Sequence, residues 1–405
     1  MGFSKKIKII SLSIVLLPLL VATTVITLLG RTELFREAES RLVAVREIKE
    51  QNIAAMLHDF RAGLEVAASA VAELPQLEQT ESLTPFFSAI NQQLGFYDLF
   101  VINSAGDIIY TVARESDLHT NLQHGPYRDS GLGRLFQQLR ARDNQVLMED
   151  FSPYAPSNNE AAAFLGKAIT LNQERVYVAA QLSIDKINSV MQIRAGMGDS
   201  GETYLVGSDF RMRSDSYLDP QQRNIQASFR GTVAANGVDT KAVREALAGQ
   251  NGVIQVIDYN NNAVLSAFAP LNVFGVRWAL LAEIDVAEIA APARRMLFTG
   301  IGISLAALLL AILAAELVCR LVIRPLGGEP EQMCQLTSVI ASGDFTTELM
   351  VPEQPGHVMG WLAKMQHTLK GLISQLLGIS RELENTATQN SAAITQADGS
   401  IQLQA

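Results

Sequence analysis

Cysteine and charged side chains are scarce in this sequence. Only two cysteines, Cys319 and Cys334, occur in 405 residues, and two cysteines without nearby histidines do not make a zinc site. Charged residues make up 18% of the chain and hydrophobic residues 48%. This composition is too apolar for an ordinary soluble chain and too polar for a polytopic one. It indicates soluble domains carried on a few membrane spans.

Catalytic motifs are also lacking. The sequence has no HExxH, no GxSxG and no P-loop, and its five histidines are scattered. The GGEP at residues 327–330 lacks the rest of a cyclase signature. A histidine-kinase output would need a phosphoacceptor helix and a nucleotide-binding fold, for which too few residues follow. We therefore expect a protein that is not an enzyme and has no cofactor and no metal site.

Two long uncharged runs, residues 9–30 and 297–315, predict membrane spans at residues 9–30 and 297–318. A helix of about 20 residues covers a hydrocarbon core of roughly 30 Å. The first run could instead be a signal peptide, but no Ala-x-Ala site closes it. By the positive-inside rule, basic residues before the first run and after the second place both chain ends in the cytoplasm: Lys5, Lys6, Lys8, Arg320 and Arg324. Residues 31–296 are then periplasmic and, because both cysteines lie inside, free of disulfides.

Apolar residues recur in steps of three and four over residues 31–74, which predicts one long helix within a helical region, 31–90. Such a helix would be about 66 Å long. Two roles remain open at this point. The helix could be buried against its own domain along its length, or it could form a stalk that pairs with a second chain.

An internal repeat follows the helix. Residues 100–104 (FVINS) align with residues 204–208 (YLVGS), and residues 175–183 align with residues 277–285 at nearly the same offset. Each copy ends at a residue expected to cap a helix, Ser183 or Asp285. Further strands are expected between these markers, so two similar α+β modules should follow one another. The expected strands are 145–151 and 163–170 in the first copy, and 253–259 and 264–270 in the second.

The segment after the second span resembles a HAMP domain, which is a parallel four-helix bundle made by two chains. Two short helices with apolar seams are separated by a polar connector, and the first follows Arg324-Pro325-Leu326. Because proline fits the first turn of a new helix, we expect Pro325 to act as a joint. The acidic residue that usually opens the second HAMP helix is replaced by His357-Val358-Met359-Gly360. The expected seams are Leu326, Met333, Leu336 and Ile340, then Val358, Leu362, Met365, Leu369 and Leu372.

The order of these parts resembles a methyl-accepting chemotaxis protein with a double Cache sensor, of α+β class with two PAS-like modules. The pieces YDLFVINSAGDIIYTV, GETYLVGSDFRMRSDS, HGPYRDS and EDFSPY are the most characteristic. The long cytoplasmic signalling hairpin is not in this sequence, so the resemblance implies a receptor truncated before it. The expected parts are a cytoplasmic start (1–8), the first span (9–30), the long helix (31–90), a membrane-distal module (91–195), a membrane-proximal module (196–296), the second span (297–318), HAMP (319–376) and the start of the signalling coiled coil (377–405).

Family sensors hold small molecules in the outer module, between the sheet and its covering loops. Sensors of α-amino acids carry Arg-x-Trp, then Tyr-x-Asp, then a later Asp that takes the amino group. The matching places here read Gly125-Pro126-Tyr127, Tyr154-Ala155-Pro156 and Gln181, so the carboxylates are missing. An ammonium group without a carboxylate is costly to bury, and Arg114 and Lys167 favour an anionic ligand such as a small carboxylate. The expected site residues are Tyr110, Arg114, Tyr127, Asp129, Asp150, Tyr154, Lys167 and Gln181.

The resemblance thus implies a homodimeric inner-membrane chemoreceptor that binds a small periplasmic solute and signals through its second span and HAMP. In a full-length receptor its partners would be the chemotaxis kinase and its coupling protein, and no nucleic acid. Two alternatives stay open. The chain could be the sensor half of a histidine kinase or diguanylate cyclase, or an output-less decoy receptor that forms mixed dimers.

Overall fold

The computed structural model describes residues 3–142, 145–345 and 356–402. The chain divides into two compact units. One unit is Leu28–Arg295, and the other combines the two ends of the chain, up to Thr27 and from Met296 onward. The first unit contains both sheets, and the second contains helical segments throughout its described residues.

A single helix, α1 (Phe3–Ala72), includes both the first apolar run and most of the helix predicted for residues 31–74. It ends at Ala72 because Leu74 precedes Pro75, and a residue before proline is disfavoured in the helical conformation. The region expected to be helical to residue 90 therefore breaks into shorter pieces. These are η1 (Leu77–Leu83), α2 (Thr84–Ile90) and the π-helical turn η2 (Asn91–Gly95).

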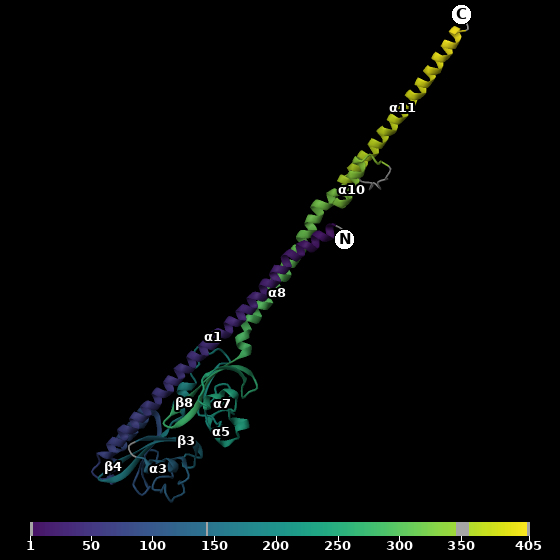
Figure 1. Ribbon diagram of the computed structural model, residues 1–405. Coiled ribbons are helices and arrows are strands. Elements are labelled where there is room, and N and C mark those ends of the chain that lie inside the picture. Colours follow the sequence, from purple (N-terminus) through teal and green to yellow (C-terminus); the bar gives the residue numbers. More distant parts are fainter. Residues whose placement is uncertain (1–2, 143–144, 346–355, 403–405) are drawn as a thin grey trace. The chain divides into compact units, whose positions relative to one another are not determined.

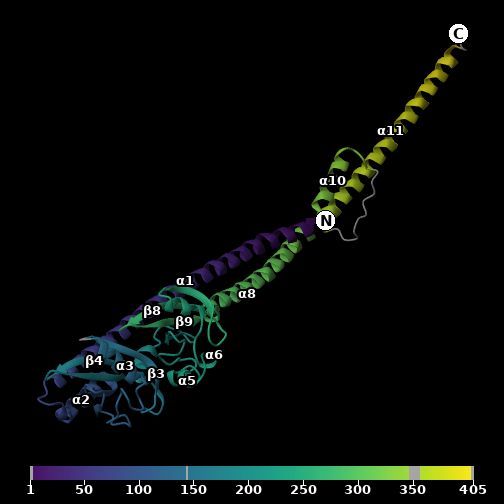
Figure 2. The same cartoon turned by 60° about the horizontal axis from the view of Figure 1, so that its bottom comes forward.

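The first sheet has five antiparallel strands in the order β2-β1-β5-β4-β3. Its side chains alternate between two covering helices. Leu99 and Val101 pack with the α1 residues Phe60 and Leu64, whereas Phe100 lies on the opposite face, in the cluster formed with α3. Figure 2 shows α3 beside β3 and β4. The elements are β1 (Phe96–Ile102), β2 (Ile108–Thr111), α3 (Gly131–Ala141), β3 (Val146–Tyr154), β4 (Glu160–Leu171), β5 (Glu174–Leu182) and α4 (Ile184–Met191).

The second sheet has four antiparallel strands in the order β6-β9-β8-β7. Ala38 and Leu42 of α1 cover one face, and α7 covers the other; Figure 1 shows α7 next to β8. The order β6-β9-β8-β7 repeats the order β1-β5-β4-β3, which confirms the internal repeat seen in the sequence. The elements are β6 (Glu202–Gly207), α5 (Ile225–Arg230), α6 (Val233–Asn236), α7 (Lys241–Leu247), β7 (Gly252–Ile257), β8 (Ala263–Val273) and β9 (Val276–Asp285).

The long helix packs within its own chain between residues 53 and 71. Ile53, Leu64, Ala67 and Val71 are fully buried against the sheets. Between the two open roles, the structure therefore supports burial against its own domain for this stretch. Ile48, which the periodicity placed on the same stripe, is exposed.

Two helices are long and apolar enough to cross a membrane, with mean hydropathies of 2.6 and 2.5 in their most apolar windows. The first is α1, and the second begins with α8 (Val286–Val318), which follows β9 directly. Each carries large apolar side chains with no cover, for example Ile14, Leu17, Leu305 and Leu310. Apolar surface of this kind suits a lipid environment.

The expected joint at Pro325 is displaced. A π-helical turn, η3 (Cys319–Ile323), and the short α9 (Arg324–Leu326) carry the helix past this proline. The chain turns instead at Gly327, whose φ of 73° is one that glycine adopts without strain. The next helix, α10 (Pro330–Ala341), has a proline in its first turn, and α11 (Val358–Gln402) follows. Both prolines stand in the first turn of a helix, Pro325 in α9 as expected and Pro330 in α10. Part of the connector, residues 346–355, lies outside the described residues.

Removing the ring that joins α1 to the first sheet should destabilise the sensor region. Phe60 is 1% exposed and its ring stacks on Phe96 with centroids 5.0 Å apart. Phe60→Ala should lower the free energy of unfolding by about 3–5 kcal/mol. Val66→Ala on the exposed face of α1 should change it by less than about 0.5 kcal/mol. Urea unfolding of the chain in detergent, followed by tryptophan fluorescence, measures both; equal midpoints would contradict the packing described.

Candidate functional site

A pocket of about 370 Å³ opens where the first sheet meets the 215–226 segment that follows β6. Its wall is built from β1, β5, the start of α4 and the turn between β3 and β4. The lining includes carboxylates and amides but no lysine and no arginine: Tyr97, Ser157, Glu160, Gln181, Asp185, Asp215, Asn224 and Gln226 are its polar members, with Ser183. The pocket is therefore negative in character.

A chain of hydrogen bonds runs along this wall. The Tyr97 hydroxyl donates to Glu115 Oε1 at 2.7 Å, and Ser157 Oγ donates to Glu115 Oε2 at 2.8 Å. The bond to Glu115 helps raise the pKa of Tyr97 to about 12. Gln181 Nε2 lies 3.4 Å from Ser157 Oγ, and the buried Gln181 Oε1 has no hydrogen-bond partner among the described residues. A polar atom of this kind is available to a ligand.

Two fully buried aspartates stand close to this chain in the fold. Asp117 Oδ2 accepts a 2.6 Å bond from the Tyr154 hydroxyl, while Asp117 Oδ1 has no partner among the described residues. Asp98 accepts from the backbone N–H groups of Leu99 and Ala113 and from the Thr111 hydroxyl. Burial raises the pKa of Asp98 to about 6 and also raises the pKa of Asp117.

No lysine or arginine among the described residues forms an ion pair with Asp98, Glu115 or Asp117. The nearby Arg114 directs its guanidinium to Glu81 instead, at 2.5 Å. An unpaired carboxylate away from water is unfavourable unless a cation or a proton compensates it. The arrangement can therefore accept a positively charged group.

Of the residues expected from the sequence, the structure brings Tyr127, Tyr154 and Gln181 to this region. The rings of Tyr127 and Tyr154 lie 6.3 Å apart, and the Tyr127 hydroxyl contacts Ser116 Oγ at 3.0 Å. Tyr154 is fully buried, as is Phe164, against which it packs edge-on.

The structure separates the other expected residues from it. Tyr110 packs on Phe87 in the α1 core and donates to Thr84. Asp129 is on the surface, paired with Arg128. Lys167 lies between Leu165 and Ile169 on β4, and these alternate positions belong to the face that packs on α1. Arg114 and Lys167 therefore do not line the pocket.

Sequence reasoning missed the carboxylates that dominate the site. Asp98 interrupts the otherwise apolar strand Phe96–Ile102. A charged residue inside an apolar strand could have marked it as a candidate site residue. Glu115 and Asp117 lie in an irregular segment, where nothing in the local pattern distinguishes them from solvated charges. Only the fold brings them to Tyr154 and Ser157.

Asp150, also expected in the site, instead joins the two sheets. Its carboxylate binds Arg213 in a bidentate pair, with Nε–Oδ1 at 2.9 Å and Nη2–Oδ2 at 2.7 Å. The indole N–H of Trp278, on β9, donates to Asp150 Oδ1 at 3.0 Å. Arg213 is 2% exposed, and it fits beside β6 because Gly207 there has no Cβ to collide with the guanidinium.

Neutralising this bridge should weaken the contact between the sheets. Asp150→Asn should lower the free energy of unfolding by about 2 kcal/mol, below the 3–5 kcal/mol typical of a broken buried pair. The smaller value is expected because Asp209 still pairs with Arg213 at 3.0 Å. Asp129→Asn, at an exposed pair, should change it by less than about 0.5 kcal/mol. Urea unfolding compares the two variants, and equal effects would show that the bridge contributes little.

A family model described as a Cache domain matches residues 32–293. A curated relative, the probable chemoreceptor y4sI of Sinorhizobium fredii, is 22% identical over 276 residues, which are 67% of this chain and 33% of the relative. The chain thus spans about one third of that relative's length.

Solved structures with similar folds include three chemoreceptor domains. The periplasmic sensory domain of Campylobacter jejuni Tlp1 aligns with a TM-score of 0.48 and 12% identity, covering 64% of this chain and 99% of that one. The ligand-binding domain of Pseudomonas fluorescens CtaA, in complex with L-isoleucine, aligns with a TM-score of 0.45 and 13% identity, covering 64% and 97%. The ligand-binding domain of Pseudomonas aeruginosa PctB, in complex with L-Gln, aligns with a TM-score of 0.45 and 15% identity, covering 62% and 93%.

Proposed function

The chain belongs to the Cache domain family through residues 32–293, and on this basis we propose that it is the sensor part of a bacterial transmembrane chemoreceptor. The family match supports a ligand-sensing module rather than an enzyme. The curated relative is a probable chemoreceptor. Two apolar helices flank the sensor, and their basic ends, with Lys8 and Arg320 closest, favour cytoplasmic termini and a periplasmic sensor in the inner membrane.

The ligand of this sensor is a small solute with a positively charged group, such as an amine. The observation that carries this proposal is the Asp117 carboxylate. It is fully buried, its Oδ1 has no partner within hydrogen-bonding geometry among the described residues, and it stands beside the pocket without being one of the lining residues. An ammonium group would provide the missing donors and the missing charge together. The anionic ligand favoured by the sequence has less support, because it depended on Arg114, which pairs with Glu81, and on Lys167, which lies on the face of β4 that packs on α1.

Ligand binding should depend on Asp117 and not on Lys167. In thermal-shift assays of the chain in detergent, butylamine, 4-aminobutyrate and butyrate would separate the contributions of amine and carboxylate. A ligand at 100 times its Kd should stabilise the folded state by about 2.7 kcal/mol. Asp117→Asn keeps an acceptor for Tyr154 and should abolish the shift given by the amines.

The matched control is Lys167→Met, which should leave that shift intact. A shift from butyrate alone, retained in Asp117→Asn and lost in Lys167→Met, would restore the anionic ligand and refute this proposal.

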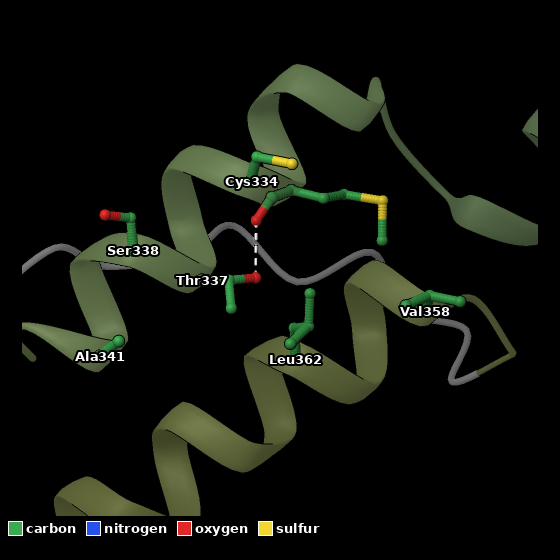
Figure 3. Close-up of a pocket in the computed structure, with 7 residues that line it drawn as sticks. Cys334, Thr337, Ser338, Ala341, Val358 and Leu362 are labelled. Atoms are coloured by element: carbon green, nitrogen blue, oxygen red, sulfur yellow. Dashed lines mark hydrogen bonds between the residues drawn. The ribbon is translucent and has the colours of Figure 1, made fainter.

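The helices after the second span are proposed to form HAMP over residues 319–376 and the start of a signalling coiled coil over residues 377–405. Figure 3 shows a groove between α10 and α11, lined by Met333, Thr337, Val358 and Leu362 with three smaller residues. Along α11, leucines recur every seven residues at 362, 369, 376 and 383. Leu376 and Leu383 are 65% and 64% exposed in the single chain. A heptad seam of this kind is typical of helices that pair in parallel, so the proposed occupant is a second copy.

Cysteines placed on this seam should cross-link between two chains. In a background with Cys319 and Cys334 replaced by serine, Leu376→Cys should form a disulfide dimer in membranes, because seam positions of a parallel pair face each other. Ser374→Cys, on the outer face of the same helix turn, is the matched control. Equal yields from the two positions would contradict the paired seam.

A further inference from the structure

Three polar side chains form a row across the second sheet. Glu283 on β9 stands directly opposite Glu202 on β6 and directly opposite Ser266 on β8. Side chains at such positions lie on the same face, with Cβ atoms about 4.5–5.5 Å apart. All three are buried, at 2%, 2% and 0% exposure in that order. Two carboxylates therefore lie side by side in the interior of the module.

The row repeats the one in the first sheet. There, Gln181 on β5 stands opposite Asp98 on β1 and opposite Phe164 on β4. The alignment of the two copies places Glu283 at the position of Gln181 and Glu202 at the position of Asp98. In the first module the neutral amide of Gln181 stands beside the carboxyl group of Asp98. In the second module the carboxyl group of Glu283 takes the place of that amide, beside Glu202. Glu283 matches the neutral amide only while it carries a proton.

Hydrogen bonding distinguishes the two glutamates. Burial raises the pKa of Glu202 as well, but more hydrogen bonds favour its anion, since it accepts from the hydroxyls of Tyr259 and Ser216 and from the N–H groups of Tyr217 and Leu218. Glu283 accepts only from the Tyr204 hydroxyl, at 2.7 Å. Among the described residues, Glu283 Oε1 and Ser266 Oγ have no partner within hydrogen-bonding geometry, although Ser266 is close enough to lower the pKa of Glu283 in part. The proton of the pair therefore belongs on Glu283.

Within the part of the chain that the structure describes, no basic side chain forms an ion pair with either glutamate. Arg223 stacks on the Tyr259 ring at 5.0 Å but pairs with Asp219. The charged residues of α7 pair with one another or with Asp239 on the exposed side of that helix. Asp258 adds a further negative charge near Glu283, and Tyr204 and Tyr259 stay neutral. Burial, with the charge of Glu202, raises the pKa of Glu283 to about 7.

We propose that Glu283 is a proton-binding site of the second module: it binds a proton beside ionised Glu202, and losing that proton places two like charges against each other inside the sheet. The site goes beyond the proposed amine-binding pocket and does not depend on it. Its location also gives the proton an effect at a distance. Glu283 lies two residues before the end of β9, and β9 continues directly into α8, the second apolar helix.

The sign of the effect follows from the raised pKa. A carboxyl group whose folded-state pKa exceeds its unfolded value stabilises the fold fully below the unfolded pKa, about 4.3. This stability is lost as the pH rises through about 7. The second module should therefore loosen between pH 5 and pH 8 as the proton leaves.

Infrared titration tests the site directly. In the whole chain, in detergent, carboxylic-acid carbonyl intensity should be lost as the pH rises through about 7, and Glu283→Gln should lack that component while keeping the one that Asp98 loses near pH 6. Glu245→Gln, on an exposed ion pair of α7, is the matched control and should keep both components. An unchanged band in Glu283→Gln would overturn the proposal.

A second measurement does not require Glu283 to be replaced. Trp361→Phe leaves Trp278 on β9 as the remaining tryptophan of the two in the chain. In this background the urea midpoint should fall between pH 5.5 and pH 8. Glu202→Gln removes the neighbouring charge, so it should move both the fall and the loss of the infrared band to lower pH. If Glu202→Gln leaves both midpoints where they were, the two carboxyl groups are not coupled and the proposal fails.

Discussion

The fold of the sensor depends on a single helix covering both sheets. Each sheet is covered by a short helix or loop on one side, which leaves an apolar face that must be shielded from water. The α1 helix covers both of these faces, with Ala38 and Leu42 on the second sheet and Phe60 to Val71 on the first. Lys49 adds a polar attachment, because its ammonium donates to the carbonyls of Val190, Met191 and Ile193 at the end of α4. Burial there lowers the pKa of Lys49 to about 8.

With that helix in place, the opposite faces of the two sheets hold the polar chemistry. Asp98 and Gln181 occupy this face in the first sheet, and Glu202 and Glu283 occupy it in the second. The shared backbone positions follow from the internal repeat. The chemistry differs because the first module faces a pocket, whereas the second closes over its carboxyl groups with Tyr204 and Tyr259. One row is thus suited to a solute and the other to a proton.

The bridge from Asp150 to Arg213 and Trp278 connects these two halves. Trp278 stands on β9, the strand that leads into α8, so a change at β3 reaches that strand through one side-chain contact. A bidentate arginine pair fixes direction as well as distance, and it transmits a displacement better than a single flexible contact does. The buried charge pair thus joins the two sheets, and β9 continues covalently into α8.

The sequence by itself determined the long helix, the two apolar runs, the repeated α+β modules and most strand positions. These features follow from local periodicity and from runs of apolar residues, which any window of the chain reveals.

Ser183 was placed correctly at the start of α4, although its side chain makes no capping bond. Tyr127, Tyr154 and Gln181 were found through family resemblance, and the fold does bring them to one region. The turn of the chain at Gly327 rather than at Pro325 needed the backbone, because the sequence does not show that the helix continues for one residue past the proline before a positive φ ends it. Only the tertiary structure decided which charges meet. Strand register sends Lys167 to the α1 face, an irregular segment carries Asp117 to Tyr154, and Asp150 reaches across to Arg213. These contacts join segments that are far apart in the sequence, so no local sequence pattern specifies them.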